Sequence, residues 1–238
     1  IALQSNSPAI DHIPAASCPA TDQRGNARPD GTSESKCDIG AYESSYPPVL
    51  TASGKSVSAT EGSAFSGVVA TGTAYEAGAL SATIRWGDST TSAGTVTLAS
   101  DGSYSVTGSH TYAEEGASLA LTVQVSGSGG LSATGTGSAA VTDAALAAST
   151  PKAVIKVRTL TLRTTFTDAD PKRTVSDYTA SINWGDGTTP SAGKIGSSGT
   201  SFTATGSHKY ARHGTYTVTV TIKDAGGSSV KKTLTLKV

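Results

Sequence analysis

The fold of this chain is decided by a stretch that reads Ile182-Asn183-Trp184-Gly185-Asp186-Gly187 and is followed by Gly206-Ser207-His208-Lys209-Tyr210. An earlier copy reads Ile84-Arg85-Trp86-Gly87-Asp88 and is followed by Gly108-Ser109-His110-Thr111-Tyr112. The tryptophan and the histidine are 24 positions apart in both copies, and the copies are offset by 98 residues. A period of that length corresponds to a repeated domain rather than to the short coil of a solenoid.

The residues around the two copies favour short strands and tight turns. Of 238 residues, 36% are hydrophobic and 5% aromatic, and methionine is absent. Small and β-branched residues predominate, which suits strands better than helices. Residues 216–222 alternate with period two, and Asp101-Gly102 is a hairpin signal. We therefore predict an all-β chain with two tandem β-sandwiches, residues 47–146 and 147–238, joined by a short linker at residues 144–151.

The repeated motif has a physical explanation within such a sandwich. A single tryptophan on a central strand can fill much of a small core. An aspartate beside glycine accepts backbone N–H groups and fixes a turn, and a tyrosine before the crossing strand forms a corner. The histidines are expected to hydrogen-bond locally at that corner. The predicted structural motif consists of Trp86, Asp88, His110 and Tyr112 and of Trp184, Asp186, His208 and Tyr210.

The second copy, continued by Gly-Thr-Tyr-Thr-Val-Thr-Val at residues 214–220, resembles the polycystic kidney disease (PKD) domain family. Residues 175–222 carry the resemblance throughout. The first copy departs from the pattern, because Ser89 replaces the second glycine and residues 117–119 read Ala-Ser-Leu. The resemblance implies an immunoglobulin-like sandwich of the kind found in extracellular proteins.

Residues 1–46 form a distinct, proline-rich segment that contains the two cysteines, Cys18 and Cys37. In a short loop-rich stretch they predict a disulfide in an oxidising compartment, and a free pair in a cytosolic protein is the alternative. The ordered motifs SPAID, CPATDQRG and CDIGAYE resemble the closing segment of secreted "choice-of-anchor Q" proteins. That resemblance implies a cap on the last coils of a parallel β-helix, in a piece of a longer exported protein. We expect Asp22, Arg24 and Asp38 to form ion pairs and turn caps there, rather than a catalytic site.

Charge is distributed unevenly along a chain whose formal net charge is zero. The net charge is −3 over residues 1–46, −5 over residues 47–146 and +8 over residues 147–238. Unlike ends attract, so the pattern predicts a head-to-tail contact that could propagate into a filament. The alternative is that the lysines protect a sheet edge and keep the domain soluble. The candidate basic surface consists of Arg158, Arg163, Lys231, Lys232 and Lys237.

Catalytic and cofactor motifs are not found in the sequence, so we expect no enzyme activity and no cofactor. His208 and His213 lack the cysteine or carboxylate partners of a zinc site. Asp168, Asp170 and Asp186 are weak calcium candidates, because spaced carboxylates in turns offer hard oxygen ligands. No apolar run reaches the ~18 residues of a membrane helix, and interleaved aromatic and basic residues for nucleic acid are missing.

Two functions agree with this sequence. The first is a non-catalytic extracellular structural or adhesive module: a stalk, spacer or surface-assembly repeat that contacts other proteins or cell-surface and matrix glycans. The alternative is an accessory region, either carbohydrate-binding or a spacer, of a secreted β-helix enzyme that acts on polysaccharides. A row of exposed aromatic side chains would favour the second function. The candidates for such a row are Tyr75, Tyr104, Tyr178 and Tyr216.

Overall fold

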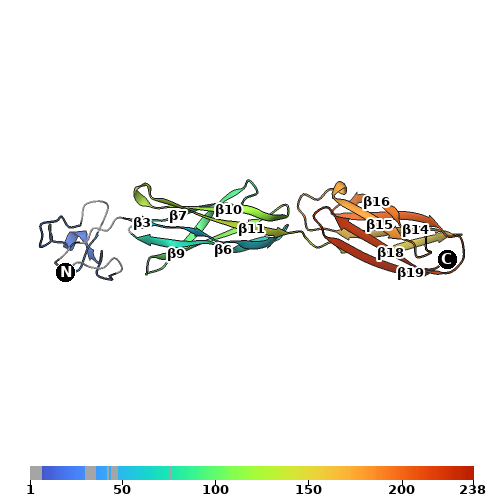
Figure 1. Cartoon of the computed structure of the whole chain (residues 1–238), viewed down its shortest axis with the longest axis horizontal. Helices are drawn as coiled ribbons and strands as arrows, with labels where there is room; N and C mark the ends of the chain where they lie inside the picture. Colours follow the sequence, from blue (N-terminus) through green and yellow to red (C-terminus); the bar gives the residue numbers. More distant parts are fainter. Residues whose placement is uncertain (1–6, 30–35, 42, 44–47, 76) are drawn as a thin grey trace.

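The computed structural model describes residues 7–29, 36–41, 43, 48–75 and 77–238. The described part is built from β-strands and three short 3-10 helices, and it contains no helix with the length and apolar character to span a bilayer. Two β-rich domains follow one another along the longest axis of the molecule, with the N-terminal segment and the C-terminus at opposite ends (Figure 1). The predicted all-β class is confirmed, and the two domains lie end to end.

The first domain has two layers that share one strand. Residues 91–94 of β8 pair with β7, and residues 95–98 of the same strand pair with β9. The strand order is therefore continuous, β3-β6-β9-β8-β7-β10-β11-β5, with β4 also paired to β6. The strands are β3 (Val49–Leu50), β4 (Ser53–Gly54), β5 (Val57–Thr60), β6 (Ala64–Tyr75), β7 (Ser81–Arg85), β8 (Thr91–Leu98), β9 (Ser103–Thr111), β10 (Gly116–Ser126) and β11 (Ser132–Thr142), with the 3-10 helix η2 at Ser128–Gly130.

The second domain repeats this arrangement, and its crossing strand is β16. Residues 191–193 pair with β15 and residues 194–198 with β17, giving the order β12-β14-β17-β16-β15-β18-β19, with β13 also on β14. The strands are β12 (Ala147–Ala148), β13 (Lys152–Lys156), β14 (Thr159–Thr167), β15 (Tyr178–Asn183), β16 (Ser191–Ser198), β17 (Ser201–Lys209), β18 (Thr215–Asp224) and β19 (Ser229–Lys237), with the 3-10 helix η3 at Val175–Asp177.

The expected linker at residues 144–151 is wrong, because these residues belong to the second domain. Strand β12 lies inside that range and pairs with β14. Leu146 is 8% exposed and belongs to the second hydrophobic core. An apolar side chain that is buried this close to β11 leaves almost no free chain between the domains.

Each domain has its own core, with one tryptophan near the centre. Trp86 is 0% and Trp184 is 1% exposed. Around them pack alternate residues of the strands, as the period-two pattern requires. In the second domain Val218, Val220 and Ile222 of β18 all face this core.

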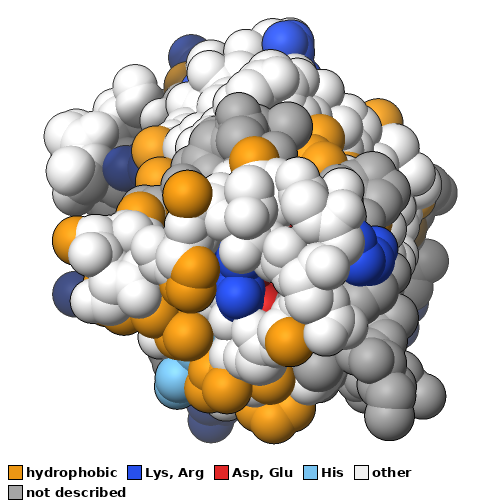
Figure 2. Space-filling model, turned by 90° about the vertical axis from the view of Figure 1, so that its left-hand side faces the viewer, with side chains coloured by type: hydrophobic (Ala, Val, Ile, Leu, Met, Phe, Trp, Pro, Cys, Tyr) orange, Lys and Arg blue, Asp and Glu red, His pale blue; other side chains and the backbone are white. Residues whose placement is uncertain are grey.

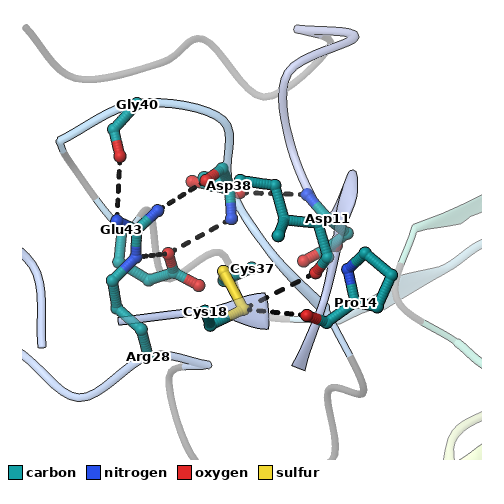
Figure 3. The surroundings of a disulfide bond; sticks show 9 residues. Asp11, Pro14, Cys18, Arg28, Cys37, Asp38, Gly40 and Glu43 are labelled. Carbon is teal, nitrogen blue, oxygen red and sulfur yellow. Dashed lines mark hydrogen bonds and ion pairs between the residues drawn. A yellow bond between two sulfur atoms is a disulfide. The ribbon is translucent and has the colours of Figure 1, made fainter. Parts of the chain in front are cut away.

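The N-terminal segment has little regular structure where it is described. Its strands β1 (Ile13–Pro14) and β2 (Lys36–Cys37) pair antiparallel, and the 3-10 helix η1 spans Ala15–Ser17. The disulfide between Cys18 and Cys37 is present, as predicted. Arg28 lies beside it, where its guanidinium binds the carboxylate of Glu43 and main-chain carbonyls (Figure 3). The pairings among the described residues of this segment are antiparallel, so the expected end of a parallel β-helix is not shown.

Candidate functional site

The repeated motif forms the same four-residue cluster in both domains. In the second domain His208 stacks on the Trp184 ring at 5.1 Å, and its Nε2 lies 2.7 Å from the Asp186 carboxylate. Tyr210 donates its hydroxyl to the Trp184 carbonyl at 2.9 Å. In the first domain the ring distance is 4.8 Å and the His110–Asp88 distance is again 2.7 Å. In both domains the cluster fixes the turn after the tryptophan strand to the hydrophobic core, so its role is structural.

Two polar partners of this cluster were not identified from the sequence. The Trp86 indole donates to Ser92 at 2.9 Å, and the Trp184 indole donates to Ser191 at 2.9 Å. This serine recurs in both copies, one position out of register, and that recurrence could have indicated its role as the partner of the indole. The first copy also keeps its turn without the second glycine, because Ser89 adopts the left-handed conformation at φ 72°, where Gly187 has φ 83°.

Asp186 should contribute to stability in a way that depends on pH. Burial alone would raise the pKa of Asp186, but hydrogen bonds from Thr188 and His208 outweigh it and lower that pKa to about 2. A carboxyl whose pKa is lowered by folding stabilises the protein above its unfolded pKa, and the contribution is lost as pH falls through the folded pKa. We expect Asp186→Asn to cost about 2 kcal/mol at neutral pH.

The measurement is urea unfolding of the parent and Asp186→Asn between pH 6 and pH 2. The difference in unfolding free energy should be constant down to about pH 4 and then shrink toward pH 2. Asp88→Asn serves as the companion variant, because hydrogen bonds from Thr90 and His110 outweigh burial and lower the pKa of Asp88 as well. A difference that does not change over this range would contradict the assignment.

The junction between the two domains is a separate polar site. Glu61 follows β5, and its carboxylate accepts the backbone N–H of Ala144 at 3.0 Å. A Cβ on the next residue, Gly62, would lie 2.2 Å from the carbonyl oxygen of Ala169, so the two domains touch closely here. Lys172 extends from the second domain to Glu114 of the first, with 3.6 Å between Nζ and Oε1.

Acidic side chains of both domains gather at this junction. They line a cavity of about 150 Å³ in which Lys172 is the one basic residue. Burial raises the pKa of Glu61 to about 7; the hydrogen bond from Ala144 opposes this shift, and the neighbouring Asp170 and Asp143 carboxylates add to it. Burial also raises the pKa of Asp224 to about 6. The acidic residues that line the cavity are Glu61, Glu114, Glu115, Asp170, Asp177 and Asp224.

The calcium candidates of the sequence do not lie together. Asp168 and Asp170 are in the turn after β14, where Asp168 accepts hydrogen bonds from Asp170 N–H and from the Tyr178 hydroxyl. Asp186 lies in the turn after β15, bound to His208. Tyr178 is the first residue of β15 and Asp186 follows the last residue of that strand, so Asp186 lies at the opposite end of the domain. The predicted trio is therefore wrong as a single site.

The predicted basic surface is also divided. Lys231 and Lys237 are exposed on one face of β19, whereas Lys232 points to the other face and is half-buried. Arg163 belongs to β14, in the other layer. Arg158 is half-buried and donates to the carbonyl of Ala211. These five residues do not form one continuous patch.

The described acids of residues 1–46 offer little exposed charge to that surface. Of the four acids that the structure describes in residues 1–46, three are buried, namely Asp22, Asp38 and Glu43. Asp22 pairs with Arg24, and Asp38 accepts the backbone N–H of Asp11, as ion pairs and turn caps should. Viewed from the end at which the N-terminal segment lies, the described surface shows Lys and Arg side chains and hardly any Asp or Glu (Figure 2).

The four tyrosines considered for sugar stacking form no exposed row. Tyr104 is 3% and Tyr178 is 4% exposed. Tyr216 is half-buried and stacks on the buried ring of Tyr210 at 4.3 Å. The hydroxyl of Tyr75 is buried. The structure therefore removes the observation that would have favoured carbohydrate binding.

Comparison with known families gives one match, which covers the second domain. Residues 143–238 match the PKD domain. No curated protein matches the chain. The matched residues begin at 143 and therefore include Asp143 and the other second-domain acids at the junction.

Solved structures similar to this chain include the PKD1 domain of Vibrio anguillarum Epp, at 21% identity and a TM-score of 0.31, covering 40% of this chain and 93% of that one. A tetra-tandem repeat from the extending region of a large adhesion protein has 18% identity and a TM-score of 0.39, covering 80% of this chain and 49% of that one. Protocadherin Gamma B2 extracellular cadherin domains 3–6 have 15% identity and a TM-score of 0.36, covering 81% and 47%.

Proposed function

We propose that this chain is a non-catalytic spacer in an extracellular or cell-surface protein, in which two stacked sandwiches hold other parts at a fixed separation. The observation that carries the proposal is the close junction: Gly62 packs against Ala169, and Glu61 binds Ala144 N–H. Contacts of this kind, with almost no free chain between the domains, limit bending. The PKD match and the disulfide support an extracellular setting.

The pairing of an early strand of the first domain with its last strand supports a role under tension. In the first domain β5 and β11 run parallel, with Val57 opposite Ala139 and Thr60 opposite Thr142. Tension on the two ends of this domain pulls the parallel strands in opposite directions. The load is then shared by the hydrogen bonds of the pair, which must break together rather than one after another.

Single-molecule force spectroscopy of the full chain, held at its two ends, tests this proposal. We expect two discrete unfolding events, each of which releases roughly 300 Å of chain, the length of about one extended domain. Trp184→Ala should weaken one event and leave the other unchanged, because each domain has its own tryptophan core. Smooth extension at low force without discrete events would reject a tension-bearing spacer.

The predicted head-to-tail self-association stays a prediction, and its charge basis is weaker because the acids of residues 1–46 are partly buried. The β-helix cap likewise stays a prediction from the sequence motifs. Binding of cell-surface or matrix glycans is not supported by the four candidate tyrosines, because they form no exposed row.

A further inference from the structure

The strongest unexplained feature of the molecule is a buried carboxylate at the junction, that of Glu61, one of whose two oxygens has no hydrogen-bond donor. Glu61 is 2% exposed, and while its Oε1 accepts Ala144 N–H, its Oε2 is buried without a hydrogen-bond donor. Asp143, four residues before β12, also has one buried oxygen, Oδ1, without a donor. Buried ionised oxygens without donors are costly, so such groups bind a proton or a cation.

The surroundings of Glu61 favour a cation. One carboxylate oxygen each from Glu61, Glu114 and Asp170 lies within 4.8 Å of the others, and no other group of this kind occurs among the described residues. Glu61 and Glu114 come from the first domain and Asp170 from the second. Glu114 is exposed while the other two are buried, so the group opens to solvent on one side. An ion can enter by that side and keep water ligands there.

From this geometry we infer that the junction binds Ca²⁺ through Glu61, Glu114 and Asp170, and that the ion ties the two domains together. The donors are all oxygens, which suit Ca²⁺ and disfavour Zn²⁺, since Zn²⁺ prefers nitrogen and sulfur. Ca²⁺ accepts six to eight ligands in irregular geometry, so three carboxylates with waters form an adequate set. Mg²⁺ requires near-octahedral geometry at shorter distances, which carboxylates from two separate domains match less well.

Two basic groups near the site do not replace the ion. Lys172 forms its ion pair with Glu114, and its side chain is 65% exposed. Arg173 donates to the main-chain carbonyl of Asp170 rather than to its carboxylate. The buried Oε2 of Glu61 therefore has no cationic partner among the residues that the structure describes. Asp168 is held by Tyr178 and by Asp170 N–H, so it positions the Asp170 turn and is not assigned as a ligand.

The binding test is calorimetric titration of the chelator-treated full chain with CaCl₂, with thermal melts in parallel. We expect one Ca²⁺ per chain with a dissociation constant on the order of 10⁻⁴ to 10⁻³ M, the range of extracellular calcium modules. Asp170→Asn and Glu114→Gln should each weaken binding by at least ~10-fold. The matched control is Asp101→Asn, which removes one exposed carboxylate of the first domain at the far hairpin.

A second variant separates an ion site from a structural role. Glu61→Gln keeps the size of the side chain and removes its buried charge. We expect it to raise the melting temperature in chelator, because the repulsion is relieved, and to abolish the rise that Ca²⁺ gives the parent. If Glu61 only supported the fold, the same change would lower the melting temperature in chelator.

Three outcomes would overturn the inference. The first is a parent chain that shows neither heat nor a melting shift at millimolar Ca²⁺. The second is Asp170→Asn and Glu114→Gln binding as tightly as Asp101→Asn, which would place the ion elsewhere. The third is Mg²⁺ giving the same affinity and shift as Ca²⁺, which would reject the assignment to calcium.

Discussion

Trp184→Ala should destabilise the second domain by ~3–5 kcal/mol, the usual range for removing a large aromatic side chain from a core. Trp184 is 1% exposed, and its indole donates to Ser191 while its ring supports His208. Alanine leaves a cavity and removes both the hydrogen bond to Ser191 and the stacking contact with His208. For a domain of this size, such a loss lowers the melting temperature by more than ~12 °C.

The chain provides its own internal control for this measurement. Each domain has one tryptophan, so in Trp184→Ala the fluorescence of Trp86 reports the first domain alone. Urea unfolding followed by that fluorescence should change little, while circular dichroism should show an early transition of the second domain. Trp86→Ala should give the reverse result. A variant that melts like the parent would show that the tryptophan is not part of a packed core.

Local motifs carried most of what the sequence could predict. The spacing from Trp184 to His208 repeats that from Trp86 to His110. An equal spacing indicates that the same strands pair in the same register twice, and it therefore predicted two domains. Alternation at residues 216–222 identified β18. The Asp186–His208 pair was not predicted, because its members are 22 residues apart and meet only when β17 is in register with the turn.

The acidic cluster at the junction could not be predicted from the sequence, because its members are also far apart along the chain. Glu61, Glu114 and Asp170 are spread over more than a hundred positions, and no spacing in the sequence indicates that they meet. In a sandwich, however, every second turn falls at the same end. The acids after β5, β9, β11 and β14 and at the end of β18 therefore converge and make the junction acidic.

Gly62→Val should uncouple the two domains. Gly62 has φ 67°, and a Cβ at this position would lie 2.2 Å from the Ala169 carbonyl oxygen. Valine must therefore displace either its own turn or the second domain. The matched control is Gly129→Val, because Gly129 has φ 66° and no atom within 4 Å of the added Cβ. It imposes the same backbone strain in the same domain without touching the neighbour.

The spacer proposal is tested most directly by the distance between the two domains in solution. This distance can be measured by pulsed electron paramagnetic resonance in buffer that contains calcium. The spin labels are attached to cysteines introduced at two exposed strand positions, Gln124 on β10 and Thr233 on β19. The native cysteines are joined in a disulfide, so only the introduced ones are labelled. We predict one narrow distance distribution for the parent and for Gly129→Val, and a broad one for Gly62→Val. A parent distribution as broad as that of Gly62→Val would contradict a rigid junction and with it the spacer function.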